Sequence, residues 1–305
     1  PSEIRFARDT DFPVKAATIT ADLAVIADAT KGNPAWDVRY ASVAKSLNNV
    51  LKKTQGLMDG FARKDVAAIK DVQDADFRGW YARNGSGAKL LADLDAVIAA
   101  DMALSREEAA YAEASHSDLL KSARLLYRLA QERQKPDAQR ESGYQERDLS
   151  FIKARLTRLE QSFVPGVDQA RYAAALNRYA RIDQKLRPQG LDALLPNANT
   201  LDALYKSTGL AETSKRLAWM NQDADAFRKS NDPFIVLAVR LNDVANSLEE
   251  RRKEVDGNLD RTIPQYMAAV IAYKKSQGKP VYPDANSTLR VTFGTVSPYS
   301  PRDGL

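Results

Sequence analysis

Apolar residues recur at spacings of three and four along most of the chain, and this periodicity constrains the fold more than any other feature. A clear case begins at Asn33 and Pro34, a helix N-cap followed by proline at the first helical position, and is expected to end at Gly56. Its apolar stripe consists of Trp36, Tyr40, Val43, Leu47, Val50, Leu51 and Thr54. An amphipathic helix of this kind must bury its stripe, so we expect it to pack against other helices.

The same pattern returns in the second half of the chain. Asp232 and Pro233 predict another helix start, and the apolar residues behind them are Phe234, Leu237, Leu241, Val244 and Leu248. Polar breaks near residues 134–143, 187–200 and 275–287 separate the helices into hairpins without indicating separate domains. The sequence therefore predicts an all-α, multi-helix domain.

The pattern changes near the end of the chain. Leu289, Val291 and Phe293 alternate with polar residues or glycine, which is the period of two that a β-strand requires. A single strand cannot pair its own backbone N–H and C=O groups, and a helical chain offers it no neighbouring strand. We therefore expect the partner strands to lie in sequence outside these 305 residues, and the chain to be part of a larger protein.

Composition argues against several classes of protein. The net charge is +5, but basic and acidic residues alternate, and no basic block is interleaved with stacking aromatics, so nucleic-acid binding is not expected. No apolar run approaches the roughly 20 residues of a membrane-spanning helix. The absence of cysteine excludes disulfides and thiolate metal sites. The first residues, "PSEIRF", contain no basic and apolar signal pattern, so we expect no export signal within these 305 residues.

Residues for catalysis are scarce. His116 is the only histidine, and its polar surroundings predict an exposed position on a helix rather than a general base. Motifs for nucleophilic serine, zinc or phosphate sites are absent, and we predict no catalytic residue, metal or cofactor in this chain. The residues alone indicate a helical module without an active site of its own, which leaves a non-enzymatic scaffold or binding module open.

Several stretches resemble one family of enzymes. They are "VRYASVAKSLNNVLKKTQGLMDGF" (38–61), "ESGYQERDL" (141–149), "DPFIVLAVRL" (232–241) and "VYPDANSTLRVTFGTVSPYSPRDG" (281–304). Together they resemble the bacterial dipeptidyl peptidases of serine-peptidase family forty-six, which includes dipeptidyl peptidases 7 and 11. The resemblance extends over most of the chain.

The resemblance implies a chymotrypsin-like double β-barrel with a large helical domain inserted in it. On that basis residues 1–12 connect from the first barrel, residues 13–277 form the helical cap domain, and residues 278–305 return into the second barrel. The catalytic His and Asp would then lie before Pro1 and the nucleophilic Ser after Leu305. This chain alone is expected to be inactive, and the rest of the barrel is its expected partner.

The resemblance also implies a binding role for one asparagine. In the family, an Asn on a cap helix helps to hold the free α-ammonium group of the peptide substrate, which limits cleavage to dipeptide release. Aligning the following lysine with Lys52 places that role on Asn49, with Asn48 beside it as the alternative. Asn49 also lies about 200° from the apolar stripe, so its amide is expected to be free. The resemblance further implies a periplasmic location, with a homodimer as one form of the full-length enzyme.

Overall fold

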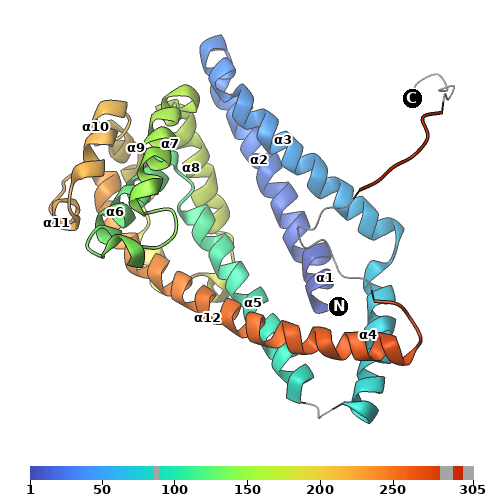
Figure 1. Cartoon of the computed structure of the whole chain (residues 1–305). Helices are drawn as coiled ribbons and strands as arrows, with labels where there is room; N and C mark the ends of the chain where they lie inside the picture. Colours follow the sequence, from blue (N-terminus) through green and yellow to red (C-terminus); the bar gives the residue numbers. More distant parts are fainter. Residues whose placement is uncertain (86–88, 282–290, 298–305) are drawn as a thin grey trace.

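The computed structural model describes residues 1–85, 89–281 and 291–297, and every regular element in these ranges is helical. This confirms the predicted all-α fold (Figure 1). The α-helices are α1 (Ser2–Phe6), α2 (Phe12–Thr30), α3 (Pro34–Arg63), α4 (Val66–Asn84), α5 (Lys89–Ala114), α6 (Asp118–Glu132), α7 (Leu149–Ser162), α8 (Pro165–Tyr179), α9 (Ala198–Ser207), α10 (Thr213–Ala218), α11 (Ala224–Arg228) and α12 (Pro233–Ser276). A π-helical turn, Ala7–Asp11, joins α1 to α2.

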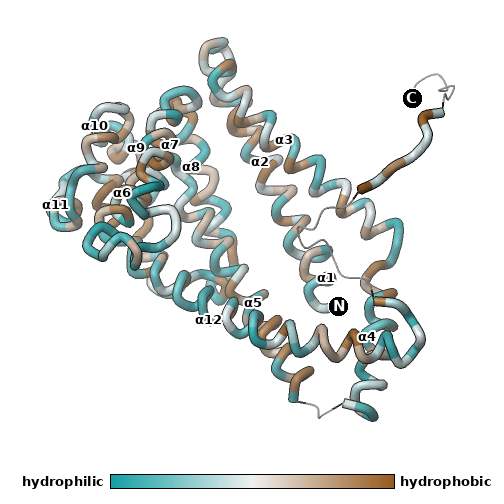
Figure 2. The backbone as a smooth tube through the Cα atoms, in the orientation of Figure 1, coloured by the Kyte–Doolittle hydropathy of each residue, from teal (hydrophilic) through white to brown (hydrophobic). Residues whose placement is uncertain are grey.

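The main hydrophobic core surrounds α6. Its residues Leu119, Leu120 and Leu126 are fully buried, and α6 packs against the first half of α12, with α5, α7 and the short helices around it. Apolar and polar residues alternate along these helices (Figure 2). The predicted apolar stripe of α12 is confirmed, because Phe234, Leu237 and Leu241 are buried in this core.

The second half of α12 reaches a separate aromatic cluster. This helix has 44 residues and is therefore roughly 66 Å long, which carries its C-terminal half past α5 to α4 (Figure 1). There Phe77 and Tyr81 of α4 pack against Tyr266 and Tyr273 of α12, with ring centroids of Phe77 and Tyr266 5.4 Å apart. The cluster fixes the far end of the longest helix.

Helices α2 and α3 form an antiparallel hairpin that packs against α8. Ile26 of α2 and Tyr40 of α3 meet Val164 and Val167 at the start of α8 in a third, smaller hydrophobic cluster. The hairpin is thus joined to the main core through α8 and, more weakly, through α7.

Predicted helix starts are confirmed, whereas one predicted end is wrong. The Asn33 side chain accepts a hydrogen bond from the backbone N–H of Trp36, and Asp232 caps α12 by accepting from Phe234 and Ile235. Helix α3 does not end at Gly56 but continues to Arg63. Its packing against α2 outweighs the roughly 1 kcal/mol that a glycine costs within a helix.

The predicted C-terminal strand lies partly outside the described residues, which omit Leu289 and Arg290. Its described portion, residues 291–297, has no helix or strand, and Val291, Phe293 and Val296 are 73%, 98% and 99% exposed. The last helix in the described ranges, α12, ends at Ser276. The domain boundaries at residues 12 and 277 stay predictions. Within the described ranges, no helix combines the length and apolarity needed to cross a membrane.

Candidate functional site

Asn48 and Asn49 lie side by side on α3, but only Asn48 forms a side-chain hydrogen bond to a described residue. Both residues are exposed. The Asn48 Nδ2 donates to the backbone carbonyl of Ala44 at 2.9 Å. Asn49 makes no side-chain hydrogen bond to any residue that the structure describes, so both its carbonyl oxygen and its amide remain available to a ligand.

Helix α3, which carries Asn49, contacts neighbouring helices both before and after this residue. Toward the N-terminus, Tyr40 is 1% exposed, and Arg39 Nη1 donates to the carbonyls of Glu160 and Phe163 at the end of α7, at 3.2 and 3.3 Å. Toward the C-terminus, the Phe61 ring packs edge-on against Phe12 at the start of α2, with centroids 5.8 Å apart. Asn49 therefore belongs to an anchored helix.

The charges around Asn49 are all positive along its own helix. Lys45, Lys52 and Lys53 are exposed within a turn or so of it, and α3 has no acidic residue between Asp37 and Asp59. Nearby lysines disfavour a bound ammonium group, by up to about 1 kcal/mol for a charge 4 Å away in water. A carboxylate from another part of the protein is needed for Asn49 to hold an ammonium ion well.

His116 is not on an exposed helix face, so that prediction is wrong. It lies in the turn between α5 and α6, and its side chain is only 21% exposed. Its Nε2 lies 3.3 Å from Oδ2 of Asp22 on α2 and 3.2 Å from Nη2 of Arg171 on α8. Arg171 also donates to Asp22 Oδ2 at 2.7 Å. His116 was misplaced because the turn at Ser115–Ser117 interrupts the helical pattern.

The buried ion pair of Asp22 and Arg171 shapes the electrostatics at this junction. Burial acts to raise the pKa of Asp22, but hydrogen bonds from His116 and Arg171 outweigh it and hold that pKa well below its usual range. The pair joins residues 149 positions apart, which explains why sequence reasoning did not single it out. It ties the α2–α3 hairpin to α8.

Ser117, next to His116, is not a nucleophile activated by that histidine. Its hydroxyl is fully buried and donates to Asp168 Oδ2 at 2.8 Å, and the Tyr205 hydroxyl donates to the same oxygen at 2.7 Å. Asp168 also accepts from the backbone N–H of Asp118 at 2.9 Å. These contacts form a closed structural network rather than a catalytic triad. Among the described residues, no group of three histidines or carboxylates is arranged to hold a metal ion.

Comparison with known proteins decides the family. The model of the family described as peptidase S46 matches residues 1–305, the whole chain. The chain belongs to the peptidase S46 family. An Asp/Glu-specific dipeptidyl-peptidase from Shewanella putrefaciens is 38% identical to this S46 chain over 312 residues, covering 100% of the chain and 42% of that protein.

More distant relatives agree with this placement. A dipeptidyl-peptidase 7 from Porphyromonas endodontalis is 24% identical over 292 residues, covering 92% of the S46 chain and 34% of the relative. The crystal structure of Porphyromonas endodontalis DPP11 matches the fold with a TM-score of 0.58 at 23% identity, covering 100% of this chain and 44% of that one. The S46 chain thus spans less than half the length of the relatives it matches.

Proposed function

We propose that this S46 chain is the helical cap domain of a serine-type dipeptidyl peptidase, which removes dipeptides from the free amino terminus of peptides. The proposal rests on the family match and on relatives named as dipeptidyl-peptidases. In this proposal the catalytic triad is supplied by a β-barrel domain outside these residues. His116 and Ser117 are already engaged in structural contacts here, which supports that assignment.

Asn49 is the residue proposed to contact the substrate. Its exposed, unpaired amide on an anchored helix is the observation that carries this assignment. A neutral carbonyl oxygen can accept a hydrogen bond from an α-ammonium group without adding another titratable group to the site. In this proposal the carboxylate partner of the ammonium group comes from the barrel domain, because α3 has lysines and no acidic residue near Asn49.

The test is Asn49→Ala in the complete peptidase. A hydrogen bond to a charged group contributes about 1.5–3 kcal/mol, so kcat/KM for dipeptide release from free-amine substrates should fall roughly ten- to a hundred-fold. Thermal stability should be nearly unchanged, because the substitution removes an exposed side chain without a hydrogen-bond partner.

Asn48→Ala is the matched control, since Asn48 is the neighbouring exposed asparagine and its Nδ2 already donates to the backbone carbonyl of Ala44, which orients the side chain along α3. It should leave kcat/KM near the wild-type value. Substrates with a blocked amino terminus, which lack the ammonium group, should lose little further activity in Asn49→Ala. A selective loss in Asn48→Ala instead would move the contact to that residue, and no loss in either would refute the assignment.

The cellular setting is part of the same proposal. We propose a periplasmic location and a full-length enzyme that forms a homodimer, on the basis of the sequence resemblance. Osmotic-shock fractionation of the native organism and sedimentation of the full-length enzyme test these two points directly. Recovery in the cytoplasmic fraction, or a monomer at all concentrations, would contradict them.

A further inference from the structure

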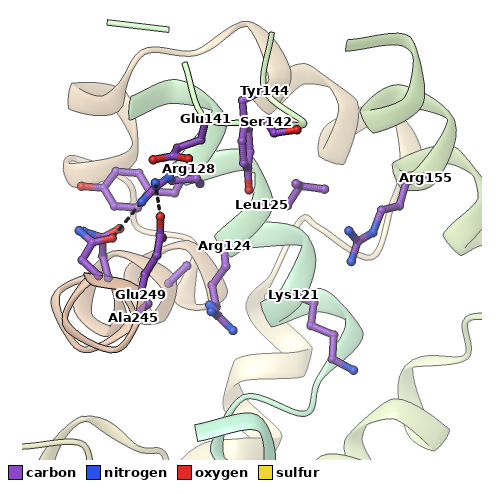
Figure 3. Close-up of a pocket in the computed structure, with 14 residues that line it drawn as sticks. Lys121, Arg124, Leu125, Arg128, Glu141, Ser142, Tyr144, Arg155, Ala245 and Glu249 are labelled. Atoms are coloured by element: carbon purple, nitrogen blue, oxygen red, sulfur yellow. Dashed lines mark hydrogen bonds and ion pairs between the residues drawn. The ribbon is translucent and has the colours of Figure 1, made fainter. Parts of the chain in front are cut away.

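A pocket of about 400 Å³ opens on the main helical core, away from the residues proposed to contact substrate. Lys121, Arg124 and Arg128 of α6 lie along one wall, Arg155 of α7 approaches from another, and Tyr144 closes a third side (Figure 3). The amide of Asn242 on α12 also lines it and makes no hydrogen bond to a described residue. Cations from two helices thus converge on one cavity.

The charges of these cations are only partly compensated. Arg128 is paired with Glu132 at 2.9 Å and with Glu249 at 3.0 Å. Arg124, by contrast, donates to Ser115 Oγ at 3.1 Å and lies over the Tyr111 ring. Neither Arg124 nor Arg155 forms an ion pair with a carboxylate in the described part of the chain. Glu141 and Glu249 also line the pocket, but both are paired with Lys253, at 2.8 and 3.0 Å, so the four cations of the lining still outweigh its carboxylates and the pocket keeps a positive potential.

Hydrogen bonds position the loop that carries Tyr144. The backbone N–H of Glu141 donates to the buried Glu132 carboxylate at 3.0 Å. Gly143 adopts a φ of +91°, a conformation that favours glycine, and its N–H donates to Asp148 Oδ2 at 3.1 Å. These residues belong to the "ESGYQERDL" stretch, and their contacts fix Tyr144 at the pocket wall.

Tyr144 presents its hydroxyl to the cations. This hydroxyl makes no hydrogen bond to a described residue, and the Tyr144 ring points into the pocket (Figure 3). Burial raises the pKa of Tyr144, while the positive charges of Arg128, Arg155 and Arg124 act to lower it. All three arginines line the same pocket as Tyr144, whose hydroxyl stays protonated and able to donate.

We propose that this pocket binds a small multivalent anion bearing phosphate or carboxylate groups. Arg124 and Arg155 supply planar guanidinium donors without a carboxylate partner among the described residues. Lys121, which is paired with Asp118 at 3.3 Å, adds a third cation, and Tyr144 and Asn242 add neutral hydrogen-bond donors. Concave pockets with a few convergent polar groups are typical ligand sites. The proposal is independent of the peptidase activity, because none of these residues is assigned to the substrate site.

The test measures thermal stability of the 305-residue chain in inorganic phosphate and, separately, in citrate, with chloride controls of equal ionic strength. A ligand that binds the folded state raises Tm in a concentration-dependent way. We expect a saturable rise with at least one of the two anions. The anion with the higher affinity identifies whether phosphate or carboxylate groups are preferred.

Arg155→Gln is the main variant, because Arg155 is exposed and its replacement should not affect folding. It should weaken anion affinity about ten-fold or more, and Tyr144→Phe should weaken it by a smaller factor. Arg158→Gln is the matched control: Arg158 is exposed on the same helix, without an ion pair among described residues, and outside the pocket. A response to neither anion, or equal weakening in Arg155→Gln and Arg158→Gln, would overturn the proposal.

Discussion

Asp22→Asn tests whether the buried ion pair holds the α2–α3 hairpin onto α8. The side chains of Asp22 and Arg171 are only 3% and 6% exposed, so removing the carboxylate charge leaves a guanidinium ion buried without its main partner. Breaking such a pair lowers the free energy of unfolding by about 3–5 kcal/mol. Arg171 keeps a weaker partner in Asp118, which lies 3.7 Å away and is 26% exposed. We therefore expect Asp22→Asn to lower the free energy of unfolding by an amount near the lower end of that range.

Urea denaturation at pH 7 measures this loss. About 3 kcal/mol corresponds to a change of more than a hundred-fold in the unfolding equilibrium constant. Hydrogen exchange should accelerate more across α2 than across the first half of α12, because α12 belongs to the main core. Asp202→Asn is the control: Asp202 pairs with Lys206, but its side chain is 54% exposed, so it should cost less than about 1 kcal/mol.

The pH dependence gives a second check on the same pair. The folded-state pKa of Asp22 is depressed, so its stabilising contribution is complete above the unfolded-state value of about 3.9 and is lost as pH falls through the folded-state pKa. The difference in the free energy of unfolding between wild type and Asp22→Asn should therefore become smaller only below about pH 4. Two results would refute this reasoning. One is that Asp22→Asn lowers the free energy of unfolding at pH 7 by less than about 1 kcal/mol, and the other is that adding Arg171→Met to Asp22→Asn restores none of the lost stability.

Two further predictions concern buried polar groups. Burial and the charge of Asp118 raise the pKa of Asp168. Asp168 should therefore stabilise the fold most at pH values below its unfolded-state pKa of about 3.9, and less as the pH rises through its folded-state pKa. Carboxyl NMR should show Asp168 titrating above Asp22, and the reverse order would contradict this. Arg216 is fully buried and donates to the carbonyls of Leu156 and Leu210, so Arg216→Lys should cost about 3 kcal/mol in urea denaturation. A cost as small as that of Arg158→Lys would contradict the role of the guanidinium group.

The sequence could predict the helices because the information is local. An N-cap side chain and a following proline act within one turn, so Asn33 and Asp232 mark helix starts without knowledge of the fold. The exposure of Asn49 followed from its angle to the apolar stripe in the same way. That Asn49 contacts substrate stays a prediction, because it depends on residues outside this chain.

Tertiary structure alone decided the features that depend on distant residues. Gly56 within α3 looks like a helix end in the sequence, but packing along the rest of that helix keeps it continuous. His116 lies in a partly buried turn because Asp22 and Arg171 meet there from α2 and α8. A single sequence contains the local preferences of each segment, whereas the pairing of charges 94 or 149 residues apart is fixed only when helices pack together.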